Sequence, residues 1–143
     1  MGRRPHCMVI GVGAGTGAAC ARRFARAGYT VSMIARSSER LAGFAAEIEH
    51  TAPYAVDIAD IEGYRATLRR IVADLGAPTV VIYNATLASF VSLYEVDPAK
   101  FERNFRVNTT GLLIAAQELT PAMVEAGEGA LVVTGNTAAL RGS

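Results

Sequence analysis

The sequence predicts an α/β protein built on a doubly wound parallel sheet of about five strands, with helices on both faces. Short runs rich in apolar residues alternate along the chain with longer stretches in which apolar residues recur at helical spacing. Several of the short runs are almost entirely apolar, as strands buried on both faces of a sheet are. Glycines follow the first run directly, where nucleotide-binding folds place a phosphate-binding turn. We therefore expect one Rossmann-type domain over residues 1–143.

The predicted strands are residues 7–10, 29–35, 52–56, 79–85 and 130–135. The helices between them have recognisable ends. The first extends from the glycines to Gly28, which is well placed to close it in a left-handed turn. The second begins at Ser37 or Ser38, either of which can cap it, and the third extends from near Asp60 to Gly76. Strands and helices thus alternate, as a parallel sheet with crossover helices requires.

A fourth helix is expected from Pro98 to Gly127, because Asp97 offers a capping side chain and proline suits the first helical position. The segment 86–96 before it is the one long irregular connection. Because this segment follows a strand, it is a candidate wall of a substrate pocket. Its apolar residues would equally suit contact with a partner subunit.

Composition excludes several classes of function. The net charge is +1 and the basic residues are scattered, which argues against nucleic-acid binding or a membrane-surface role. No apolar stretch is long enough to span a membrane and no signal peptide is visible, so we expect a cytoplasmic protein. Cys7 and Cys20 are expected to be buried, reduced thiols, and no metal site is expected. His6 and His50 stand at element ends and are expected to be solvated.

The glycine-rich turn between the first strand and the first helix favours a phosphate or pyrophosphate ligand. Backbone N–H groups at a helix N-terminus point toward such an anion, and the helix dipole favours its charge. A GxxxxGK[ST] loop is excluded, because Lys100 is the only lysine in the chain. Two dinucleotide-binding patterns remain: GxGxxA from Gly13 to Ala18, and GxxxGxG from Gly11 to Gly17.

The end of the second strand indicates which dinucleotide is bound. An acidic side chain there accepts hydrogen bonds from the ribose hydroxyls of NAD, whereas this chain has Ala35 and Arg36. The Arg36 guanidinium suits a 2′-phosphate, and Ser37 and Ser38 can donate hydrogen bonds to it. The sequence therefore favours NADP over NAD. The alternative is that Arg36 is only a solvated residue before a helix cap.

These motifs together resemble the short-chain dehydrogenase/reductase family over essentially the whole chain. The GxxxGxG pattern from Gly11 matches the cofactor loop of that family, so the resemblance selects this register. Asp57 and Ile58 match its acidic dipeptide beside the adenine ring. The stretch YNAT at residues 83–86 resembles its NNAG motif, with tyrosine for the first asparagine and threonine for the glycine. The stretch VNTTG at residues 107–111 matches its asparagine motif, and residues 129–135 resemble its fifth strand.

The resemblance implies an NADP-dependent oxidoreductase that transfers hydride between NADP(H) and a carbonyl or alcohol substrate. The implied cofactor-binding residues are Gly11, Gly15, Thr16, Gly17, Arg36, Ser37, Asp57, Ile58, Asn84 and Ala85. Asn108 matches the asparagine that kinks the fourth helix and takes part in a proton relay. Because that helix is expected to be buried, the Asn108 amide should need hydrogen-bond partners. The position of the carbonyl-polarising serine falls on Asn136, with Thr137 beside it.

The resemblance stops short of the catalytic Tyr-x-x-x-Lys segment, because no tyrosine here is followed by a lysine four residues later. The chain therefore corresponds to the cofactor-binding half of the family, truncated relative to it. The alternatives are a non-catalytic NADP-binding module or pseudo-enzyme, and a truncation without function of its own. The fifth strand is expected to be an exposed sheet edge. A homo-oligomer through the 98–126 helix is also expected.

Overall fold

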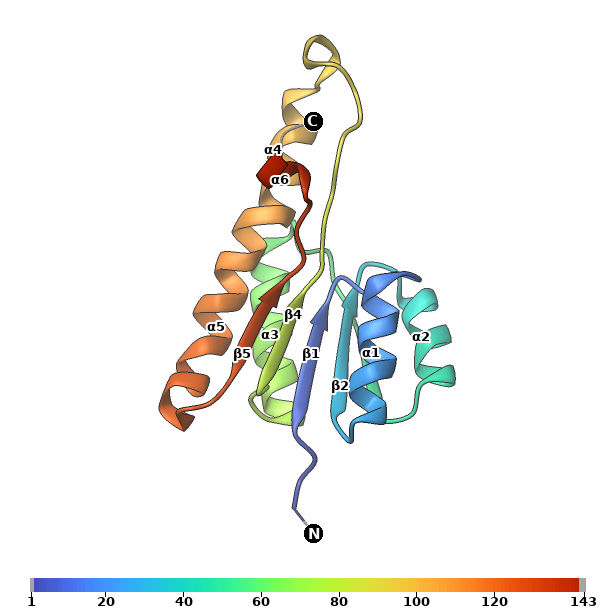
Figure 1. The fold of residues 1–143 in the computed structure, drawn as a ribbon, viewed down its shortest axis with the longest axis vertical. Coiled ribbons are helices and arrows are strands. Elements are labelled where there is room, and N and C mark those ends of the chain that lie inside the picture. The colour runs from blue at the N-terminus through green and yellow to red at the C-terminus, as the bar shows by residue number, and fades with distance from the viewer. Residues whose placement is uncertain (1, 142–143) are drawn as a thin grey trace.

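The computed structural model describes residues 2–141 and contains one parallel sheet with the strand order β3-β2-β1-β4-β5 (Figure 1). The strands are β1 (His6–Ile10), β2 (Thr30–Ala35), β3 (Thr51–Ala55), β4 (Val80–Tyr83) and β5 (Ala130–Val133). The order runs outward from β1 in both directions, so the direction of winding reverses between β1 and β4. The doubly wound fold and the number of strands are as predicted, and the strand ends differ by no more than a few residues.

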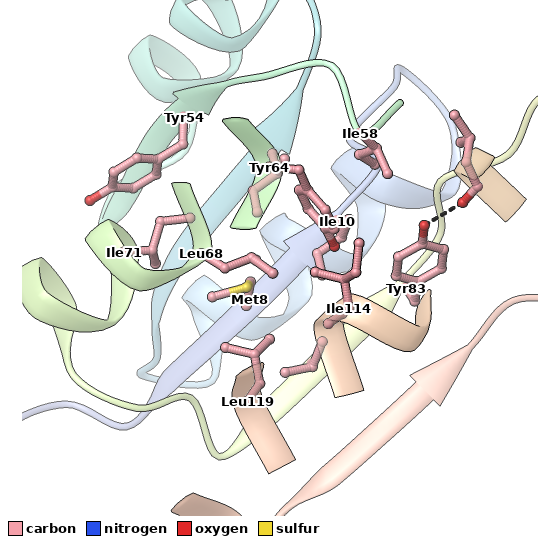
Figure 2. Packing of buried hydrophobic residues seen from close by; sticks show 14 of the residues in the cluster. Met8, Ile10, Tyr54, Ile58, Tyr64, Leu68, Ile71, Tyr83, Ile114 and Leu119 are labelled. Atoms are coloured by element: carbon pink, nitrogen blue, oxygen red, sulfur yellow. Dashed lines mark hydrogen bonds between the residues drawn. The ribbon is translucent and has the colours of Figure 1, made fainter. Parts of the chain in front are cut away.

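Helices cover both faces of this sheet. On one face lie α1 (Thr16–Arg26) and α2 (Ser38–Glu47), and on the other lie α3 (Ile61–Leu75) and α5 (Gly111–Ala126) (Figure 1). The side chains of β1 alternate between the two layers. Cys7 and Val9 pack with α1 and α2, whereas Met8 and Ile10 pack with α3 and α5 (Figure 2). All four are fully buried, and this burial on both faces of the sheet explains why residues 7–10 are all apolar.

Several helix ends follow the sequence signals. Gly28 has φ +91° just beyond α1, as the predicted left-handed turn requires. Ser37, rather than Ser38, caps α2, because its Oγ accepts the N–H of Arg40 at 3.2 Å. Asp60 caps α3 by accepting the N–H of Gly63. No helix within residues 2–141 is both long and apolar enough to cross a membrane.

The predicted helix from Pro98 to Gly127 is helical throughout, but it changes type in the middle. It consists of α4 (Pro98–Phe105), a π-helical segment (Arg106–Thr110) and α5. The Tyr83 hydroxyl, at the end of β4, donates a hydrogen bond to the Val107 carbonyl oxygen inside the π-helical segment (Figure 2). Gly111 provides the room for this contact, because a Cβ there would meet the Tyr83 hydroxyl and the Ile58 side chain.

The structure contradicts the expected exposure of His6 and agrees with the expected exposure of β5. His6 is not solvated: it is buried, with Nδ1 2.8 Å from the Gly76 carbonyl oxygen and Nε2 2.8 Å from Ser32 Oγ. The expectation was wrong because β1 begins at His6 itself, so the side chain lies inside the layers. β5 does lie at the sheet edge, and Val132 and Val133 are each 49% exposed.

Both cysteines are free, but the expectation of burial is wrong for Cys20, which is partly exposed; only Cys7 is fully buried. Burial raises the pKa of the Cys7 thiol to about 12, with a smaller contribution from Cys20. The Cys7 side chain is therefore a protonated, unreactive thiol in the core.

Candidate functional site

A hollow of about 580 Å³ opens at the carboxyl ends of the central strands, beside the point where the winding direction reverses. This is the place at which doubly wound sheets bind ligands. Its volume lies within the usual range for small-molecule pockets. Seven of the residues predicted to bind a cofactor line it: Gly11, Arg36, Ser37, Asp57, Ile58, Asn84 and Ala85.

The glycine-rich turn forms one wall of the hollow, and two of its glycines are sterically required. Gly11 has φ +93°, and a Cβ there would lie 2.7 Å from the Asn84 carbonyl carbon and closer still to Ala85. A Cβ on Gly17 would lie 2.8 Å from the Cα of Val12, so α1 can pack against the turn only through a glycine. Gly13 and Gly15, in contrast, have open space where a Cβ would be.

The exposed end of this turn presents the first residues of α1 to solvent. Gly15 and Thr16 are exposed, whereas Gly17 is buried beneath them. The N–H groups in the first turn of a helix lack acceptors within the helix, so they are available to an anion. Gly15 and Thr16 therefore lie where the sequence predicts pyrophosphate binding, although they are not among the residues that line the hollow.

Asn84 holds the turn in place. Its Nδ2 donates to the Gly11 carbonyl oxygen at 2.9 Å, and its Oδ1 accepts the Thr134 hydroxyl at 2.9 Å. The side chain thereby joins the ends of β1, β4 and β5. Each end of the amide makes one of these contacts, so Asn84 shapes the hollow and keeps one N–H and one lone pair for a ligand.

Basic and hydroxyl side chains gather at the β2 end of the hollow. Arg36 and Ser37 line it as predicted, and Arg40, one turn into α2, joins them. Ser37 Oγ accepts the Arg40 N–H, which leaves the Ser37 hydroxyl proton free to be donated. Two guanidinium groups and a hydroxyl at one rim form a donor set that suits a phosphate monoester.

A carboxylate lies near this cationic rim, at the start of the β3–α3 connection. Asp57 Oδ1 accepts the Ala59 N–H at 3.0 Å, and Oδ2 accepts Arg103 Nη2 from α4 at 2.7 Å. Partial burial alone would raise the pKa of Asp57. The Arg103 and Ala59 hydrogen bonds and the charges of Arg103 and Arg36 outweigh burial, so the pKa of Asp57 is lowered and the group stays ionised.

Asn108 lies in the π-helical segment, but it is exposed rather than buried as expected. The expectation was wrong because this part of the helix is buried on one side only: Val107 and Gly111 are buried, whereas Asn108 and Thr109 are exposed. Asn108 still finds partners: Oδ1 accepts the Leu87 N–H and Nδ2 donates to the Leu87 carbonyl oxygen, both at 2.8 Å. The side chain thus fixes the first residues of the 86–96 segment.

Asn136 and Thr137 are exposed residues between β5 and the short helix α6 (Ala138–Arg141). Asn136 Oδ1 accepts the Ala138 N–H at 2.9 Å, and the Thr137 carbonyl accepts two N–H groups of α6. In the part of the chain that the structure describes, neither residue lines the hollow. Residues 2–141 contain no group of three or more His, Cys, Asp or Glu that could hold a metal ion.

Sequence reasoning missed two of the charged residues. Arg40 could have been found, because it follows Arg36 by four residues and a cap at Ser37 places both near the start of one helix. Arg103 had no local signal, since its partner Asp57 is 46 residues away. The apolar residues Val12, Val56, Leu87 and Val107, which also line the hollow, are indistinguishable from core residues in the sequence.

Comparison with known proteins identifies the family of this chain. Residues 5–143 match the family model described as short chain dehydrogenase. Versicolorin reductase 1 of Aspergillus parasiticus is 32% identical over 140 residues, which cover 94% of this chain and 53% of that protein. The chain spans about half the length, or less, of the curated relatives it matches.

Solved structures agree in fold. The alcohol dehydrogenase of the archaeon Thermococcus sibiricus, complexed with 5-hydroxy-NADP, superposes with a TM-score of 0.88 at 27% identity, over 96% of this chain and 60% of that one. A metagenomic short-chain oxidoreductase in complex with NADP superposes with a TM-score of 0.86 at 26% identity, over 90% of this chain and 61% of that one.

Proposed function

This chain belongs to the short chain dehydrogenase family of oxidoreductases, and on that premise we propose that it binds NADP(H) as the cofactor-binding half of an enzyme. That enzyme transfers hydride between NADP(H) and a carbonyl or alcohol substrate. The observation that carries the proposal is the cationic rim at the end of β2, where Arg36, Ser37 and Arg40 line the hollow. A 2′-phosphate distinguishes NADP from NAD, and this donor set suits it.

The remaining residues fit the rest of the cofactor. The first turn of α1, at Gly15 and Thr16, offers N–H groups to the pyrophosphate. Asp57 offers carboxylate oxygens to the exocyclic amine of adenine, beside the buried Ile58. Ala85 lines the hollow at the end of β4, near the expected nicotinamide ribose. When bound, NADP(H) supplies or accepts the hydride.

Carbonyl reduction also needs a proton donor at the oxygen. No tyrosine of this sequence is followed by a lysine four residues later, so the proposal assigns that proton to no residue of the chain. Asn108 is proposed for the proton relay, in which its backbone and its contact with Leu87 would set the position of a water. Asn136 or Thr137 would lie nearest the carbonyl oxygen.

A second candidate is a non-catalytic NADP-binding module. Asn136 at the position of the polarising serine favours it, because the Asn136 side-chain oxygen is used to cap α6. Calorimetric binding of NADPH, in protein of confirmed intact mass, together with the reading frame beyond Ser143 separates the two. A Tyr-x-x-x-Lys segment in that frame supports the enzyme; tight NADPH binding without such a segment supports the module.

The cofactor proposal is tested by Arg36→Asp, with Arg22→Ala as the control. Arg22 pairs with Glu47 and does not line the hollow. Arg36→Asp should weaken NADPH binding at least about tenfold, because a charged hydrogen bond to phosphate is lost and repulsion replaces it. NADH binding should strengthen. Unchanged NADPH affinity in Arg36→Asp would contradict the proposal.

We further propose a homo-oligomer formed through the 98–126 helix. Phe101 and Phe105 on α4 are 61% and 55% exposed, and Leu113 and Val124 on α5 are 56% and 79% exposed. Exposed apolar side chains of this size, repeated along one helix, are typical of an interface. Light scattering should give at least a dimer, and Phe105→Glu should shift it toward monomer.

A further inference from the structure

We propose that Arg103 is a positioning residue for the adenine end of this site. Its guanidinium holds the Asp57 carboxylate in the orientation that selects a 6-amino purine over a 6-oxo purine. The inference rests on the proposed function, since it concerns how the same NADP(H) site reads the base.

Asp57 makes two contacts that leave part of its carboxylate free. One oxygen accepts a backbone N–H from Ala59 at 3.0 Å, and the other accepts Arg103 Nη2 at 2.7 Å. A carboxylate has about four lone-pair positions, so each oxygen keeps one after these contacts. The Asp57 side chain is 38% exposed and lines the hollow, so the remaining lone pairs can face a ligand.

Together the two contacts fix the plane of the Asp57 carboxylate. The terminal torsion of an aspartate is broad, so a carboxylate held at one oxygen can still rotate. The Ala59 contact is local, only two residues along the chain. Arg103 comes from a different element, α4, and fixes the second oxygen. A carboxylate bound at both oxygens keeps its plane, and pre-organisation of this kind strengthens recognition by lowering the ordering cost.

A fixed carboxylate can distinguish the two purines by the group at position 6. A carboxylate can only accept hydrogen bonds, so it binds the 6-amino group of adenine and repels the 6-oxo oxygen of hypoxanthine. The strength of that discrimination depends on how well the carboxylate is aimed. Without Arg103 the carboxylate would keep its charge but lose its fixed direction. Preference for the amino group should then fall, while the phosphate contacts elsewhere in the site persist.

The experiment compares two ligands, NADPH and its hypoxanthine analogue, by calorimetry with the wild-type chain, Arg103→Ala and Arg103→Lys. The wild type should prefer NADPH by about tenfold, the size of one charge-assisted hydrogen bond. Arg103→Ala should reduce this preference to about two- or threefold, mainly through weaker NADPH binding. Arg103→Lys should retain most of it, because one N–H makes the contact. Arg22→Ala is the matched control and should keep the full preference.

A role limited to holding α4 in place would give a different result. In that case Arg103→Ala would weaken both ligands by the same factor, and this outcome would overturn the proposal. An unchanged preference would overturn it as well. Asp57→Ala should abolish the preference, and adding Arg103→Ala to it should change nothing further. If Arg103→Ala does not fold, Arg103→Met keeps the aliphatic packing, and its preference between the two ligands is compared with that of the wild type.

Failure of the proposed function is recognised separately. If the proposed function is wrong, the wild-type chain and the Arg103 variants bind neither NADPH nor the analogue. The positioning proposal fails when the wild type binds NADPH and the Arg103 variants show an unaltered ratio between the two ligands.

Discussion

The side-chain amide of Asn108 binds both backbone polar groups of Leu87, accepting its N–H and donating to its carbonyl oxygen at 2.8 Å each. This pair of hydrogen bonds is the kind that a residue on a neighbouring β-strand makes with its partner's backbone. It ties the π-helical segment to the beginning of the 86–96 segment, across 21 residues of sequence. Both residues belong to parts of the chain that the proposed function places near the substrate.

Asn108→Ala should therefore loosen the beginning of the 86–96 segment. Two hydrogen bonds are lost at an exposed position, so the free energy of unfolding should fall by only about 1 kcal/mol. The local effect should be larger: hydrogen exchange at the Leu87 amide should accelerate about tenfold or more. Asn104→Ala removes a contact to Ser89 from a neighbouring position and should leave the Leu87 amide protected. Equal exchange at Leu87 in Asn108→Ala and wild type would refute this role.

Gly11 and Gly13 offer a matched pair for the conformation of the turn. Gly11→Ala requires a positive φ and places a methyl group against the Asn84–Ala85 backbone. It should lower the free energy of unfolding by at least about 2 kcal/mol. Gly13→Ala has open space and should change it by less than about 0.5 kcal/mol. Urea titration measures both values, and comparable losses would count against the geometry of the turn.

Gly15 and Gly13 form a second pair, this time for cofactor binding. Both have open space at the Cβ position, so a methyl group at either site meets no neighbouring atom. If the pyrophosphate approaches Gly15 as proposed, Gly15→Ala should weaken NADPH binding several-fold, because the backbone can no longer come as close. Gly13→Ala should weaken it less. Calorimetry on two folded variants tests this directly, and equal affinities would argue against the GxxxGxG register.

Tyr83 stands where the resemblance expects asparagine, and its hydroxyl binds the Val107 carbonyl oxygen. Burial raises the pKa of Tyr83, so the hydroxyl remains a donor at physiological pH. Tyr83→Phe should cost about 1–3 kcal/mol, because a buried acceptor loses a partner. Tyr94→Phe, at a side chain that is 96% exposed, should have no measurable effect. Equal thermal midpoints for the two variants would show that the hydroxyl contributes nothing to stability.

His6 should make stability depend on pH. Burial lowers its pKa, the charge of Arg3 adds to this, and the Gly76 carbonyl opposes it only in part. The folded state therefore holds neutral His6 where the unfolded chain binds a proton, so stability is lost as the pH falls below about 6.5. Urea titrations at pH 7.5, 6.5 and 5.5 measure the loss.

A matched pair of variants assigns that dependence to a residue. His6→Gln should flatten the change in unfolding free energy between pH 6.5 and 5.5. His50→Asn is the control, at a histidine whose side chain is 44% exposed and whose φ of +62° asparagine tolerates. A slope that persists in His6→Gln would assign the pH dependence to other groups.

The order of strands and helices follows from local patterns, and the sequence predicts it. Apolar runs such as residues 7–10, the cap at Asp60 and the glycine after α1 each act within a few residues. Local patterns predicted one helix here and not a π-helical segment, and they could not show that a tyrosine from β4 binds the Val107 carbonyl oxygen inside it. Local propensity contains no information on such a partner.

The candidate site also has features that the sequence predicts and features that only the structure shows. The sequence by itself determined the glycine-rich turn, the cationic end of β2 and the acidic residue after β3, because each is a residue type at a strand end. Only the tertiary structure decided that Arg103 binds Asp57, that Asn108 lies exposed against Leu87 and that His6 is buried. The physical reason is that these contacts join residues 21 to 70 positions apart, and only the packing of the sheet and helices brings them together.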